Sequence, residues 1–190
     1  MADKVITPQA ILSYPHLFEP QAVDGGDPKY SVALVFTADA DLSELKQAAI
    51  ATAREKWGDK ADDMIRNGTL RMPFRNDVES KGYDEVDGVV FINARSNRKP
   101  GVVSSAADPQ TGKPMPLDNP EELYAGCFVR ASLRAFAYDK SGNKGVSFAL
   151  NNVQKLGDSE VRLDSRVAAV DEFDAEQTAA DAAPDLSDLL

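Results

Sequence analysis

Along residues 126–138, GCFVRASLRAFAY, aromatic and basic side chains fall at every second position and alternate with apolar ones. Side chains in a strand point to opposite faces with period two, so every second residue of this stretch shares a face. One face would carry Phe128, Arg130, Ser132, Arg134, Phe136 and Tyr138, and the other Cys127, Val129, Ala131, Leu133, Ala135 and Ala137. The second set is uniformly apolar, so we expect it to face the core. Exposed rings can stack on bases while guanidinium groups bind phosphates, so the first set predicts a strip that binds a single-stranded polynucleotide with little dependence on its sequence.

The same alternation also has a purely structural interpretation. Phe128, Phe136 and Tyr138 could pack beneath a helix or a long loop, with the arginine stems stretched over them. Basic residues elsewhere favour the binding interpretation, because they fall at strand ends or in connections where they would widen the strip: Arg95, Arg98, Lys99, Lys140 and Lys144. Phe74, Arg75 and Tyr83 could close a loop over the strip, although an ordinary solvated loop is the simpler role for each.

A long β-hairpin would position the strip. Residues 126–138 and 144–153 both alternate, and the DKSGN between them has the residue types of a tight connection. Apolar runs predict further strands at residues 30–36, 88–96 and 101–105, with residues 4–18 as an edge strand or an irregular opening strand. Apolar spacings of three and four predict a helix over residues 41–57, capped by Asp41 or Ser43 and ended by Gly58. We expect long loops at residues 69–87 and 108–120.

Charge is distributed unevenly along the chain. The 190 residues carry a formal charge of -10, yet seven acidic and no basic residues fall within residues 171–190. Residues 95–155 reverse the sign, with nine basic and five acidic residues. Residues 171–190 have too little apolar area to offset the entropy of ordering, so we expect a disordered acidic tail.

Such a tail could simply aid solubility. It could also compete with nucleic acid for a basic groove and offer another protein a small apolar anchor among its charges. We favour this regulatory interpretation. The residues that would recruit a partner are Asp181, Asp185, Leu186, Asp188, Leu189 and Leu190.

Enzyme signatures are absent from the sequence. It has no P-loop, G-x-S-x-G or H-E-x-x-H motif, and its single cysteine, Cys127, and single histidine, His16, cannot form a disulfide or a zinc cluster. No cofactor or metal is expected, although carboxylates are plentiful enough that a magnesium-dependent nuclease stays open. No signal peptide or membrane span is visible, so we expect a cytoplasmic protein.

The segments FINARSNRKPGVV, GCFVRASLRAFAY and YDKSGNKGVSFALNNVQKLGDSEVRLDSR together resemble a family of tailed-phage single-stranded DNA-binding proteins, formerly a domain of unknown function. The resemblance covers most of residues 4–173, and its most specific part is NKG…LNNVQK. Many family members have a glycine-rich turn where this chain has Gly157, Asp158 and Ser159. The resemblance implies an OB-fold, a Greek-key β-barrel with an inserted helix, that coats DNA during phage replication and recombination. It also implies an acidic C-terminal tail that recruits replication proteins and restrains DNA binding.

We therefore expect a mainly β (α+β) protein without enzymatic activity. Residues 1–156 would form the OB-fold domain that binds single-stranded DNA, residues 157–170 a connecting segment, and residues 171–190 the disordered tail. The alternatives are a phage structural or assembly barrel that binds only proteins, and the magnesium-dependent nuclease.

Overall fold

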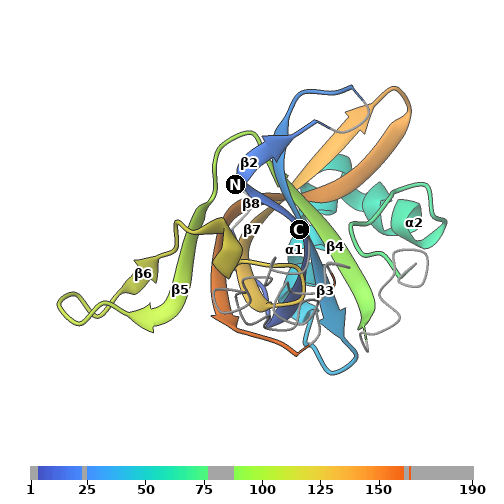
Figure 1. The fold of residues 1–190 in the computed structure, drawn as a ribbon. Helices are drawn as coiled ribbons and strands as arrows, with labels where there is room; N and C mark the ends of the chain where they lie inside the picture. The colour runs from blue at the N-terminus through green and yellow to red at the C-terminus, as the bar shows by residue number, and fades with distance from the viewer. Residues whose placement is uncertain (1–3, 23–24, 77–87, 161–162, 164–190) are drawn as a thin grey trace, which may run out of the picture.

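Five strands close into a barrel in the computed structural model, which describes residues 4–22, 25–76, 88–160 and 163 (Figure 1). They are β2 (Ala10–Gln21), β3 (Lys29–Thr37), β4 (Gly88–Ser96), β7 (Phe128–Lys140) and β8 (Asn143–Gly157). The order β7–β2–β3–β4 is antiparallel throughout, β4 runs parallel to β8, and β8 returns to β7. This is the pairing of a five-stranded Greek-key barrel, so the expected OB-type fold is confirmed.

The β7–β8 hairpin is the longest pairing in the barrel. Lys140 pairs with Asn143, which leaves Ser141 and Gly142 as a two-residue turn. Both have positive φ, 51° and 84°, as the primed turns that match strand twist require. The predicted hairpin is confirmed, and β8 runs four residues beyond the expected end at residue 153. Near its middle, Ser132 pairs with Asn152 but Leu133 pairs with Leu150, so Asn151 forms a β-bulge.

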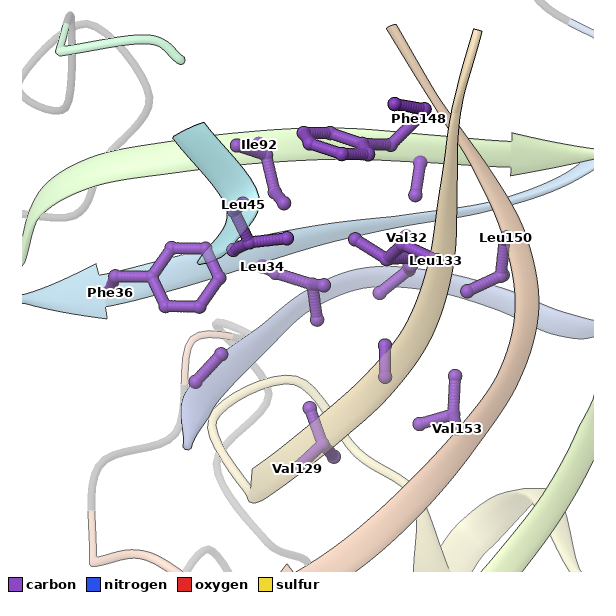
Figure 2. Close-up of a cluster of buried hydrophobic side chains, with 14 of the residues drawn as sticks. Val32, Leu34, Phe36, Leu45, Ile92, Val129, Leu133, Phe148, Leu150 and Val153 are labelled. Atoms are coloured by element: carbon purple, nitrogen blue, oxygen red, sulfur yellow. The ribbon is translucent and has the colours of Figure 1, made fainter. Parts of the chain in front are cut away.

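The barrel interior is filled by the apolar faces of its strands. Figure 2 shows the side chains of Val129 and Leu133 from β7 and of Phe148, Leu150 and Val153 from β8 within one buried cluster. The alternation predicted for residues 126–138 places the core correctly for Cys127, Val129, Ala131, Leu133 and Ala135, which are all buried, whereas Ala137 near the turn is half-buried. The other face of β7 therefore lies on the outside of the barrel.

The helix α1 (Ser43–Trp57) packs on the core through Leu45, Ala49 and Ala53. The predicted helix is confirmed, but it begins two residues later and no side chain caps its N-terminus. Asp41 instead accepts hydrogen bonds from the backbone N–H and the hydroxyl of Ser43, which hold its pKa below the ordinary value. A 3-10 turn (Gly58–Lys60) leads into α2 (Ala61–Arg66). None of the described helices is long and apolar enough to cross a membrane.

Three short strands lie outside the barrel. β1 (Lys4–Ile6) is an edge strand that pairs with β7. The strand β5 (Gly101–Ala107) pairs with β8 through its first three residues and with β6 (Pro114–Pro116) from Val103 onwards. β5 and β6 form an arm that projects away from the barrel (Figure 1).

Two expectations need correction. Residues 4–18 do not form one edge strand, because β2 pairs on both sides, with β3 and β7. The alternative of an irregular opening strand agrees with β2, whose pairing with β3 has register shifts after Ser13 and after His16. Residues 108–120 are not entirely loop, because they contain β6 and the first residue of a 3-10 turn (Pro120–Glu122). The prolines of β6 fit an outermost strand, where the N–H groups they lack have no partner strand to bond.

Candidate nucleic-acid interface

A row of basic side chains crosses the outer surface of the barrel. Arg95 of β4 pairs with Ala149 of β8, and Ala149 pairs with Arg134 of β7. Paired residues in neighbouring strands share a face, so the two arginines flank a small alanine on the outside of the barrel. Both arginines are exposed. The row continues to Lys4, which pairs with Arg134 from the edge strand β1.

Small residues line this surface along β8. The cross-strand partners of Arg134, Phe136 and Tyr138 are Ala149, Ser147 and Gly145. The long side chains of β7 therefore lie beside a floor, formed by Gly145, Ser147 and Ala149 of β8, whose side chains are small or absent. The result is a trough along β8, with Arg134, Phe136 and Tyr138 as one wall.

Two hollows lie end to end along this trough. The larger, of about 780 Å³, is lined by Lys29, Arg95, Ser96, Asn97, Arg98, Arg134, Phe136, Ala149, Leu150 and Asn151. The smaller, of about 420 Å³, is lined by Arg71, Met72, Pro73, Arg75, Asn93, Tyr138, Val146 and Ser147. Six of these residues are basic, and no described acidic residue is among them. The trough is thus a positively charged channel in a chain of negative net charge.

Backbone pairing holds the opposite wall in place. Arg71 donates its N–H to the carbonyl of Lys144 at 3.0 Å and accepts from the N–H of Val146 at 2.9 Å. Arg75 exchanges backbone hydrogen bonds of 2.9 and 2.8 Å with Phe91. Residues 71–75 therefore link β8 to β4, which positions both arginines at the end of the trough next to Tyr138.

Three arginines of the trough are open to a ligand. Within the described part of the chain, no carboxylate forms an ion pair with Arg95, Arg98 or Arg134, whereas the helix residues Arg54 and Arg66 pair with Asp62 and Asp63 at 3.0 Å. Phe136 adds a ring that is 42% exposed. Unpaired guanidinium groups beside an exposed ring can bind phosphates and stack on bases.

Comparison with known proteins identifies the family of this chain. Residues 3–183 match the model of a protein family whose description is Enterobacter phage Enc34, single-stranded DNA-binding protein. The chain belongs to this family. A protein called p50 from Acyrthosiphon pisum secondary endosymbiont phage 1 is 36% identical to this Enc34-family chain over 172 residues, which cover 86% of the chain and 88% of p50.

Two solved structures share the fold of the Enc34-family chain. One is the single-stranded DNA-binding protein of bacteriophage Enc34 in complex with single-stranded DNA, with a TM-score of 0.64 and 24% identity over 83% of this chain and 88% of that one. The other is gp2.5, a single-stranded DNA-binding protein of bacteriophage T7, with a TM-score of 0.57 and 16% identity over 88% and 99% of the two chains. The family resemblance noted in the sequence is confirmed.

The predicted site residues of the Enc34-family chain separate into groups. Arg95, Arg98, Arg134 and Phe136 line the larger hollow, and Arg75 and Tyr138 line the smaller one. Arg130 lies in a different hollow, where its Nε donates to Gln154 Oε1 at 2.7 Å. Tyr83 and the six residues of the predicted recruiting motif, Asp181 to Leu190, lie outside the described residues.

The remaining candidates lie outside the trough. The Phe74 ring packs edge-to-face on Phe148 at 6.1 Å, and Phe128 packs on a second small core of Ile11, Val35 and Phe91. Lys99 lies over the ring of Phe18, and Lys144 forms an ion pair of 3.7 Å with Asp139. Lys140 is exposed beside the hairpin turn. None of these five residues lines the trough.

Sequence reasoning missed part of the trough. Lys29 and Arg71 line it but lie far from β7 in sequence. The sequence could have predicted the floor, because Gly145, Ser147 and Ala149, at alternate positions of the predicted second strand, are all small. A long side chain at any of them would fill the channel.

Proposed function

We propose that this protein binds single-stranded DNA in the trough along β8, with little dependence on base sequence. Family membership and the shared fold support this proposal, since the Enc34 protein was solved in complex with single-stranded DNA. The observation that carries it is the row in which Arg95 and Arg134 flank Ala149 beside the exposed ring of Phe136.

Binding would combine two kinds of contact. Guanidinium groups of Arg95, Arg98 and Arg134 bind phosphates, while Phe136 and Tyr138 offer ring faces on which bases stack. Arg75 and Arg71 bind phosphates at the other end of the trough. Every base has a π-face and every nucleotide a phosphate, so such contacts hold a strand without selecting its sequence.

The biological role we infer is to coat and protect single-stranded DNA during phage replication and recombination. The protein would act by binding and not by catalysis. In this role the acidic residues 171–190 compete with DNA for the trough, because carboxylates and phosphates bind the same guanidinium groups. DNA binding then releases this segment, and its Leu186, Leu189 and Leu190 become available to a replication or recombination protein.

Fluorescence anisotropy of a labelled oligothymidine, titrated at several salt concentrations, tests the binding proposal. Arg95→Ala and Arg134→Ala should each weaken binding and flatten the plot of log K against log salt by about 0.7 for each lost phosphate contact. Lys46→Ala removes the same charge from an exposed position of α1 and should leave the slope unchanged. If both arginine variants keep the affinity and slope of the parent, DNA does not lie in the trough.

A further inference from the structure

A third hollow, smaller than the two of the trough, lies on the outer face of the barrel beyond the bulge at Asn151. It has a volume of about 290 Å³ and sits over β7 and β8, between the edge strand β1 and the base of β5. Lys4, Arg130, Ser132 and Asn152 are among the residues that line it. The site residues predicted from the sequence include only Arg130 from this group.

Ser132 is the unusual member of the group. The residue is 7% exposed, and among the described residues its Oγ is the one buried side-chain oxygen or nitrogen without a hydrogen-bond partner. A buried hydroxyl that lacks a partner destabilises a folded protein. Ser132 is among the residues that line the hollow, so a ligand that enters it could supply the partner that the protein does not.

The charged groups around Ser132 define what kind of ligand fits. Lys4 and Arg130 are both exposed, and both are basic. Gln154 holds Arg130 by accepting from its Nε at 2.7 Å, and Gln154 is itself fixed by donating to the Ser104 carbonyl at 3.2 Å. The two terminal nitrogens of Arg130 make no hydrogen bond to a described residue. Two cations and a hydroxyl donor suit a phosphate group.

The hollow is also in line with the trough. Lys4 pairs with Arg134, the trough arginine, and Arg130 lies four residues back along β7, roughly 13 Å away at the rise of a strand. A strand that leaves the trough over Arg134 would pass Lys4 and reach this hollow. Between the two sites, the bulge at Asn151 bends the surface.

We propose that this hollow is a phosphate-binding extension of the trough, in which Lys4, Arg130 and Ser132 bind the backbone of single-stranded DNA that continues past Arg134. The inference rests on the proposed function and adds a second subsite to it. Ser132 Oγ donates to a phosphate oxygen, and the guanidinium group of Arg130 and the ammonium group of Lys4 neutralise its charge. Oligonucleotides that fill only the trough do not contact it.

The test is a length series of oligothymidines, from about 4 to about 16 nucleotides, which spans the site sizes of OB-folds. Ser132→Ala should bind the longest oligonucleotides several-fold more weakly than the parent, with no change for the shortest. Its thermal stability should be equal or higher, because the variant removes a hydroxyl that has no partner. Arg130→Ala should lower the salt slope by about 0.7 for long oligonucleotides only. Ser105→Ala, which deletes an exposed hydroxyl on β5, is the matched control and should bind every length as the parent does.

The outcomes separate this inference from the proposal on which it rests. If Arg134→Ala weakens binding at all lengths but Ser132→Ala and Arg130→Ala bind long oligonucleotides like the parent, the extension is wrong and the trough stands. If the parent binds no single-stranded DNA, the proposed function itself fails. A loss of affinity in Ser132→Ala at every length would place Ser132 in the trough and also overturn the extension.

Discussion

Tyr138 lies directly over Gly145, its partner across the hairpin. A Cβ at position 145 would be 2.5 Å from the Tyr138 hydroxyl oxygen and 2.7 Å from its Cζ, closer than real Cβ atoms approach. It would also be 2.7 Å from the carbonyl oxygen of Arg71. The absence of a side chain at 145 therefore allows the ring and the 71–75 segment to meet at one end of the trough.

Gly145→Ala should consequently disturb both the fold and DNA binding. The added methyl group must displace the ring or the Arg71 backbone, so we expect the free energy of unfolding to fall by about 2 kcal/mol. Affinity for an oligothymidine should fall as well, because Tyr138 and Arg71 move. Gly157→Ala is the matched control on the same strand, since a Cβ there meets nothing within 4 Å. Urea unfolding and anisotropy would contradict the argument if the two variants behaved alike.

Substitution by alanine should mainly lower stability at Phe74 and mainly weaken DNA binding at Phe136. Phe74 packs on the core against Phe148, so Phe74→Ala should lower the free energy of unfolding by about 2 kcal/mol. Phe136 is 42% exposed in the trough, so Phe136→Ala should cost at most about 1 kcal/mol of stability and about 1–3 kcal/mol of binding free energy through lost stacking. The salt slope of Phe136→Ala should match the parent. Thermal melts and anisotropy on the pair check both halves, and equal affinities for parent and Phe136→Ala would exclude stacking on this ring.

Cys127 should be almost inert in the folded protein. Burial raises the pKa of its thiol from 9.0 to about 11, so at a given pH near neutrality the folded protein holds on the order of a hundredfold less thiolate than the unfolded chain. Labelling by an aromatic disulfide reagent should therefore accelerate at least that much when the protein is unfolded in urea.

The same shift makes stability depend on pH. The pKa of Cys127 is higher in the folded state, so the unfolded chain loses its thiol proton first as the pH rises from 9.0 towards about 11. The free energy of unfolding should fall across that window, and Cys127→Ala should lack this part of the pH dependence. In the labelling experiment described above, rapid reaction of the folded protein would contradict the prediction, because it would show that the Cys127 thiol is accessible.

Removal of residues 171–190 should raise affinity for single-stranded DNA. The deleted segment carries seven acidic residues, which compete with phosphates for the trough arginines in our proposal. The gain should be largest at low salt, where screening is weakest. Anisotropy with full-length and shortened proteins measures the effect. A variant that keeps the segment but replaces its seven carboxylates with amides separates charge from length, and an unchanged affinity in both variants would show that the segment takes no part in binding.

Local patterns in the sequence predicted much of this structure. The alternation in β7 identified Val129, Leu133 and Ala135 as core residues and placed Arg134 and Phe136 outside, since a period of two fixes the face of each side chain. The connection around Ser141 and Gly142 predicted the hairpin for the same local reason. The helix followed from its apolar spacing.

Alternation could not show which outward residues share a site. Arg130 and Arg134 lie on the same face of one strand, yet the structure places them in different hollows, on either side of the bulge at Asn151. Phe74 resembled a loop residue in the sequence but packs on the core, because residues 71–75 are tied to β8 and β4.

By itself, the sequence determined the faces of the long hairpin, the helix, the segregated charge and the membership of a phage DNA-binding family. Only the tertiary structure decided that Arg95 lies beside Arg134, because this depends on the parallel pairing of β4 with β8, strands separated by about fifty residues. Pairing between distant strands is set by closure of the barrel around its shared core, and no periodicity within either strand encodes it.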